Sequence, residues 1–161
     1  MNKTFAVAAV ALALGTAPVA AADPPLFLPE TTATAPWDGF YAGVLGGFWN
    51  GNSFYLLGGA TVGANVTLSN NFVLGVEGRG VLYSDGDLGF DGTARLGVAV
   101  DQALVYGDGG LGVREGAGHL LVGAGAEVAV MSNLSVDGRV EFVTGTGFNA
   151  IRGTVGANFH F

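Results

Sequence analysis

The feature that most constrains this chain is an alternation of apolar and polar residues with a period of two, which continues from Trp37 to the C-terminus. Successive side chains of a β-strand point to opposite faces, so the alternation predicts strands with one apolar and one polar face. All five prolines precede Trp37, and all but one of the 29 glycines follow it. Because proline cannot donate a hydrogen bond to a neighbouring strand, its absence suits strands that are paired on both sides.

The alternation divides the sequence after Trp37 into eight segments of strand length. An even number of antiparallel strands suits a closed barrel, so we expect an eight-stranded antiparallel up-and-down transmembrane β-barrel over residues 37–161. The expected strands are Phe40–Trp49, Phe54–Leu68, Phe72–Tyr83, Phe90–Val100, Ala103–Val113, Leu120–Val130, Leu134–Phe142 and Phe148–Phe161.

The size of the residues on each face indicates which face is outside. The apolar face consists mainly of Gly, Ala, Val and Leu. The bulky residues predicted on the opposite face, with the charges, are Tyr41, Trp49, Tyr55, Tyr83 and Tyr106. A soluble barrel would leave these bulky rings in water and assemble a thin core from small residues. The pattern therefore favours the inverted arrangement, in which lipid covers the apolar face and the polar face fills a narrow lumen.

Outward phenylalanines near the strand ends agree with this arrangement, since aromatic residues form girdles at both edges of a membrane barrel. One expected ring consists of Phe40, Phe72, Phe159 and Phe161, and the other of Phe48, Phe54, Phe90 and Phe142.

The charges on the polar face form the main candidate site. Carboxylates next to guanidinium groups in a narrow lumen gain charge-assisted hydrogen bonds, and an unpaired charge there is costly. We therefore expect a salt-bridged plug, whereas the excess of two acids leaves a small cation-preferring porin as an alternative. The expected members are Glu77, Arg79, Asp91, Arg95, Asp108, Glu127, Asp137, Arg139, Glu141 and Arg152.

The N-terminal residues have the pattern of an exported precursor. Lys3, the apolar run Phe5–Leu14 and the small residues Ala20–Ala22 predict a cleaved signal peptide over residues 1–22. A membrane anchor is the alternative, but Gly15 and Pro18 interrupt the apolar run. Residues 23–36 are rich in proline and predict an extended linker.

The connections between strands are expected to alternate in length. Ser69–Asn71, Asp101–Gln102 and Met131–Asn133 predict tight periplasmic turns. The other connections, expected to be longer, are Asn50–Ser53, Ser84–Gly89, Arg114–His119 and Thr144–Gly147. Even these are short, which limits the surface available for recognising a large partner.

Several strand motifs resemble small outer-membrane β-barrel proteins of the OmpA-like superfamily, particularly the alphaproteobacterial surface-antigen group. The motifs are Trp37–Gly43, Leu74–Gly78, Ala94–Gly97, Gly123–Glu127, Asn133–Ser135 and Val155–Phe161. The resemblance implies an integral protein of the bacterial outer membrane, in contact with its lipid. It also implies that Phe159 and Phe161 act as the assembly signal for the barrel-insertion machinery.

The sequence contains only weak signals, or none, for disulfides, nucleic-acid binding, nucleotide binding, metal binding or histidine-based catalysis. The chain has no cysteine, and its net charge of −7 argues against nucleic-acid binding through a basic patch. The glycine-rich run Gly107–Gly112 has the spacing of a dinucleotide fingerprint but is not followed by a helix, and Asp85–Asp87 lacks the further ligands of an EF-hand. His119, expected in a loop, and His160 fall at opposite ends of the predicted barrel.

We therefore expect no catalytic, cofactor or metal site, and a monomeric protein with a structural or surface role in the cell envelope. A soluble lipocalin-like binder remains the second alternative, although its lumen would be charged where such binders are apolar.

Overall fold

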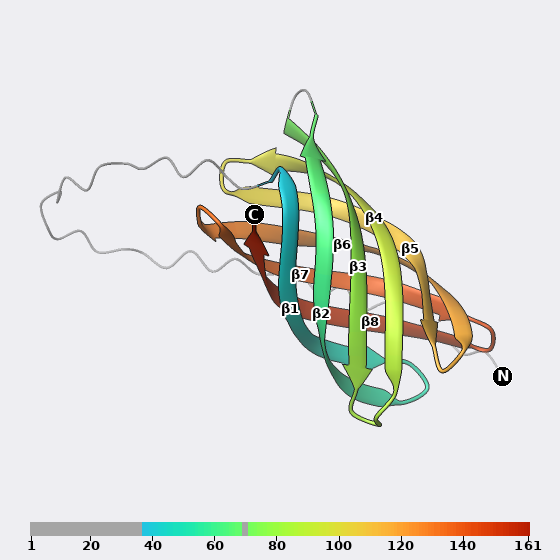
Figure 1. Ribbon diagram of the computed structural model, residues 1–161. Helices are drawn as coiled ribbons and strands as arrows, with labels where there is room; N and C mark the ends of the chain where they lie inside the picture. Colours follow the sequence, from blue (N-terminus) through green and yellow to red (C-terminus); the bar gives the residue numbers. More distant parts are fainter. Residues whose placement is uncertain (1–36, 69–70) are drawn as a thin grey trace, which may run out of the picture. The chain divides into compact units, whose positions relative to one another are not determined.

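The computed structural model describes residues 37–68 and 71–161, so the predicted signal peptide and linker lie outside the described residues. Eight strands follow one another around a closed barrel (Figure 1). They are β1 (Gly39–Asn50), β2 (Phe54–Thr67), β3 (Phe72–Tyr83), β4 (Leu88–Val100), β5 (Ala103–Arg114), β6 (Ala117–Met131), β7 (Leu134–Gly145) and β8 (Phe148–His160).

Each strand pairs antiparallel with the next, and β1 pairs with β8 to close the barrel. The closing register runs from Tyr41 opposite His160 to Asn50 opposite Ile151. The predicted fold class is confirmed, and β3 has the predicted bounds. No described residue belongs to a helix long and apolar enough to cross a membrane.

One end of the barrel, here called the mouth, is formed by the connections at residues 51–53, 84–87, 115–116 and 146–147. Two of these connections, with only two residues each, are shorter than predicted. The prediction of longer loops at Arg114–His119 and Thr144–Gly147 is wrong. Pairing between β5 and β6 continues to Arg114 and Ala117, and pairing between β7 and β8 continues to Gly145 and Phe148. Glu115 and Gly116 have φ values of 51° and 80°, as a two-residue hairpin turn with left-handed residues requires. The opposite end, called the base, contains the start of β1 and the end of β8.

The two faces lie as the residue sizes predicted. Outward apolar side chains are well exposed, for example Phe40 at 69% and Leu111 at 65%, whereas Tyr41 and Tyr106 on the opposite face are each 2% exposed. The eight phenylalanines of the two predicted girdles are all exposed. The pairing register places four of them near the base and four nearer the mouth.

Apolar side chains pack inside the barrel at each end, and charged groups occupy the length between them. The mouth cluster includes Trp49, Val81 and Tyr83, while the base cluster includes Trp37 and Val73. The inward side chains of β3 are therefore apolar near the base, charged in the middle and apolar near the mouth. This order confines the charged groups to the middle of the barrel.

Candidate functional site in the barrel interior

The ten charged residues predicted for the lumen are all buried, none more than 8% exposed. They come from β3, β4, β5, β6, β7 and β8, and their contacts form three layers between the mouth and the base. Each layer joins acids to arginines across the barrel.

The layer below the mouth cluster is centred on Glu141 and Asp91. Arg79 donates two hydrogen bonds to Glu141, at 3.1 and 2.6 Å. Arg152 donates from Nε to Glu141 at 2.8 Å and from Nη1 to Asp91 at 2.7 Å. His119 Nε2 lies 2.9 Å from the second oxygen of Asp91. Both carboxylates therefore have partners on each oxygen.

The central layer contains a bidentate ion pair between Arg139 and Glu77. Nη1 of Arg139 donates to Oε1 of Glu77 at 2.6 Å, and Nη2 donates to Oε2 at 3.2 Å. Tyr41 donates its hydroxyl hydrogen to Glu77 at 2.7 Å, and Tyr106 donates to Asp137. Arg139 Nε also donates to Asp137 at 3.2 Å. Charge-assisted bonds of this kind are about twice as strong as neutral ones.

The layer nearest the base surrounds Glu127, which is 0% exposed. Arg95 donates from Nη1 to Glu127 at 3.0 Å, and Asn158 donates from Nδ2 at 3.0 Å. Ser135 also donates to Glu127, and His160 Nε2 lies 3.3 Å from the same carboxylate. One carboxylate is thus bound by four side chains.

Asp108 differs from the other five acids. Its nearest cation is Arg139, whose Nη1 lies 3.9 Å from Oδ2. Neither carboxylate oxygen of Asp108 has a hydrogen-bond partner among the described residues, although its side chain is inside the barrel. Asp108 is therefore the most weakly paired of the six acids.

Several members of these layers were not predicted. Tyr41, Tyr106, Ser135 and Asn158 supply hydrogen bonds to the acids, and His119 lies on β6 rather than in the expected loop. The alternation in the sequence predicts that the first four of these side chains point inward, but it does not identify the residues with which they form hydrogen bonds. The two histidines lie at opposite ends of the lumen, as predicted, so they do not share one site.

Glycines on the inner wall make room for the central tyrosines. A Cβ added at Gly63 would overlap the ring of Tyr41, and one at Gly125 would overlap the hydroxyl end of Tyr106. The close approach of these rings to the wall therefore requires glycine at both positions.

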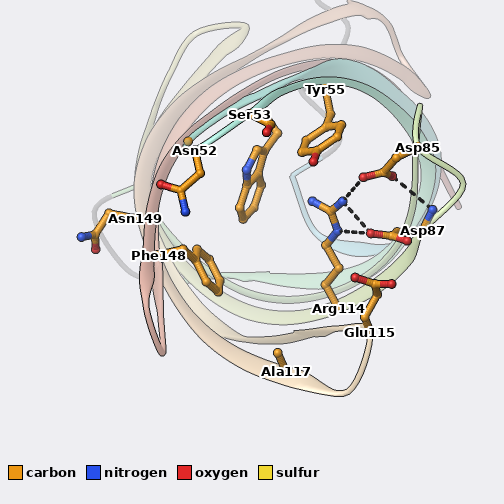
Figure 2. A pocket seen from close by; sticks show the side chains of 12 residues that line it. Asn52, Ser53, Tyr55, Asp85, Asp87, Arg114, Glu115, Ala117, Phe148 and Asn149 are labelled. Carbon is orange, nitrogen blue, oxygen red and sulfur yellow. Dashed lines mark hydrogen bonds and ion pairs between the residues drawn. The ribbon is translucent and has the colours of Figure 1, made fainter.

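A cavity of about 600 Å³, here called the cup, opens at the mouth next to the mouth cluster. Its lining includes Trp49, Tyr55, Asp85, Asp87, Arg114, Glu115 and Phe148. Figure 2 shows the side chain of Arg114 extending into the cup beside Asp85 and Asp87, with dashed lines marking the contacts. Asp85 and Asp87 lie in the connection between β3 and β4, and both carboxylates contact Arg114. Among the described residues, no group of three or more His, Cys, Asp or Glu side chains is arranged to hold a metal ion.

The predicted assembly residues lie on the outer surface at the base. Phe159 is 45% exposed and Phe161 is 78% exposed. Their ring centres are 5.3 Å apart, in an edge-to-face arrangement. The backbone nitrogen of Phe161 donates to the carbonyl oxygen of Phe40 at 2.9 Å, which attaches the C-terminus to β1.

Comparison with known proteins identifies similar barrels at low sequence identity. No family model matches the chain. No curated protein matches it either. Neisserial surface protein A has a TM-score of 0.57 and 14% identity, with 77% of this chain and 98% of that chain covered.

Two further solved structures have the same architecture. The attachment invasion locus protein Ail of Yersinia pestis has a TM-score of 0.56 and 14% identity over 77% of this chain and 99% of that one. The N-terminal β-barrel domain of Pseudomonas aeruginosa OprF has a TM-score of 0.56 and 13% identity over 75% of this chain and 97% of that one. At this identity the likeness establishes the fold.

Proposed function

We propose that this chain is an integral β-barrel protein of the bacterial outer membrane, with a structural or surface role in the cell envelope. The observation that carries the proposal is the inverted distribution of side chains, with an apolar outer surface and a charged interior. Such a surface is stable in lipid, where every backbone polar group is satisfied within the closed barrel. The similar fold of the outer-membrane protein Ail supports the same location.

In this proposal the lumen is a plug. The three charged layers and the apolar clusters at both ends fill the interior, as is usual for a barrel of eight strands. A continuous water path would have to separate arginines from carboxylates that lie 2.6–3.2 Å apart. Removing one partner of such a buried pair costs about 3–5 kcal/mol.

A small cation-preferring porin is the second candidate. The observation that favours it is Asp108, which has no hydrogen-bond partner among the described residues. Recording from planar bilayers distinguishes the two functions. We expect no discrete conductance from the purified folded protein. Cation-selective steps that change when Asp108 is replaced by asparagine would instead support the porin.

Membrane fractionation of cells expressing the precursor tests the location. We expect a protein shortened by residues 1–22, recovered in the outer-membrane fraction and soluble only with detergent. Its electrophoretic mobility should change on boiling, because the folded barrel resists the detergent until it is heated. A soluble periplasmic protein without this change would favour the lipocalin-like binder.

The remaining elements of the proposal concern biogenesis. Phe159 and Phe161 would be recognised by the barrel-insertion machinery, and the protein would act as a monomer without catalytic activity. The mouth connections are only two to four residues long. They leave little surface outside the cell for a macromolecular ligand, which makes a structural role more consistent with the fold than adhesion.

A further inference from the structure

The mouth of the barrel already holds one organic cation, the guanidinium group of Arg114. Its central carbon lies 4.1 Å from the ring centre of Tyr83, 4.7 Å from that of Tyr55 and 5.8 Å from that of Trp49. Arg114 donates from Nε to Asp87 at 2.9 Å and from Nη2 to Asp87 at 2.6 Å, and Nη2 also contacts Asp85. Aromatic faces combined with carboxylates are the usual surroundings of a bound organic cation.

Arg114 does not neutralise the mouth. The charged residues among those that line the cup are Asp85, Asp87 and Glu115 against Arg114, which leaves an excess of two negative charges. Low-dielectric walls around such a cleft focus its field and raise the local concentration of cations. The mouth therefore attracts positive charge beyond the guanidinium that it contains.

The space next to Arg114 has a second aromatic wall. The rings of Trp49 and Phe148 lie 5.8 Å apart with an angle of 47° between their planes, and both border the cup of about 600 Å³. Figure 2 shows Phe148 and Tyr55 turned into the cup, with Asn149 turned away from it. Trp49 is only 5% exposed and Phe148 is half-buried, so the wall presents mainly the ring of Phe148 to a ligand, without requiring Arg114 to move.

We propose that the mouth is a binding site for small organic cations of the guanidinium or alkylammonium class. Trp49, Tyr55 and Phe148 contribute the aromatic faces, while Glu115, Asp85 and Asp87 contribute the negative charge. Arg114 acts as the cation that the chain itself supplies, and it competes with an incoming ligand for the two aspartates. This site goes beyond the envelope role and depends only on the folded barrel.

Fluorescence of Trp49 reports on occupancy of the cup. The full chain carrying Trp37→Phe, which leaves Trp49 as its only tryptophan, is folded in an uncharged polyoxyethylene detergent. It is then titrated with spermidine and separately with N-ethylguanidinium, at constant ionic strength. We expect a saturable change in fluorescence with either cation, and none when sodium chloride replaces it.

Three variants in this background identify the groups responsible. Glu115→Gln should weaken binding by about two- to fivefold, the effect of one exposed charge pair. Asp101→Asn, at a turn of the base, is the matched control and should leave binding unchanged. Arg114→Ala should strengthen binding of N-ethylguanidinium by about tenfold, because it vacates the faces of Tyr83 and Tyr55. Arg114→Gln, which keeps the stem, replaces it if the alanine variant does not fold.

The same titrations can overturn the proposal. Absence of a saturable change in the Arg114 variant would show that the mouth binds no organic cation. A saturable response to sucrose, with none to spermidine, would identify a site for neutral sugars instead. An equal loss of affinity in Asp101→Asn and Glu115→Gln would show that net charge, and not the cup, attracts the cation.

Discussion

The ion pair between Arg95 and Glu127 offers a direct test of whether the lumen charges stabilise the barrel. Among the described residues, Glu127 is the only carboxylate within 4 Å of Arg95, so this pair is separate from the shared arginines of the other two layers. Arg95 also donates from Nε to Asn65 at 2.9 Å, and its guanidinium lies 4.7 Å from the ring centre of Tyr41. The chosen changes are Arg95→Met and Glu127→Gln, alone and together.

The expected cost follows from burial, since side chains of this pair are 2% and 0% exposed. Removing one member leaves the other charge without an ionic partner, which costs about 3–5 kcal/mol in a protein interior. Glu127→Gln should fall at the lower end, because the amide can retain bonds with Ser135 and Asn158. The double variant should be less destabilised than the sum of the single variants by about 1–3 kcal/mol.

The assay is reversible urea unfolding of the protein in phospholipid vesicles, followed by tryptophan fluorescence. Asp101→Asn serves as the control and should change the free energy of unfolding by less than about 0.5 kcal/mol. If each lumen change costs less than about 1 kcal/mol and the two costs simply add, the pair does not hold the barrel together. That result would refute the argument for a stabilising plug.

Three further predictions follow from single residues. Asp108→Asn should raise the free energy of unfolding by about 1–3 kcal/mol, because a buried carboxylate without hydrogen bonds becomes neutral; a lower urea midpoint would contradict this. Gly125→Val should lower the free energy of unfolding by about 1–3 kcal/mol through overlap with Tyr106, and a midpoint equal to the parent protein would show that the wall adjusts. Phe161→Ala should reduce the amount of heat-modifiable protein in the outer-membrane fraction of cells while leaving refolding into vesicles unchanged; equal losses in both would indicate a structural role for Phe161.

The faces of the strands could be predicted because period two determines them without knowledge of the fold. Tyr83 and Tyr106 share parity with charged residues of their own strands, and this alone predicts that they point into the barrel. The lengths of the connections could not be read in the same way. β6 begins at Ala117, and Ala117 and Gly118 are already paired with β5, whereas the alternating apolar pattern begins only at Leu120. The predicted segment therefore started later than the strand.

The identity of the ion pairs was also beyond sequence reasoning. Arg79 and Glu141 are 62 positions apart, as are Arg139 and Glu77. Parity predicts that these groups face one lumen, but their height within the barrel depends on the stagger of every strand between them. The mouth site was missed for a related reason, since Arg114 meets Asp85 and Asp87 only when β4 and β5 extend to the rim.

Accessibility of the outer surface tests the membrane-spanning arrangement most directly. The chain contains no cysteine, so single cysteines carrying a nitroxide label can be placed at the outward positions Leu120, Val122, Ala124, Ala126 and Val128 of β6. These positions cover about 19 Å of depth for a strand tilted by about 45°. For the protein in lipid vesicles, we predict that the ratio of collisions with oxygen to collisions with a water-soluble nickel complex is highest near Ala124 and falls toward both ends. High and uniform collision with the nickel complex along the strand would contradict a lipid-facing surface.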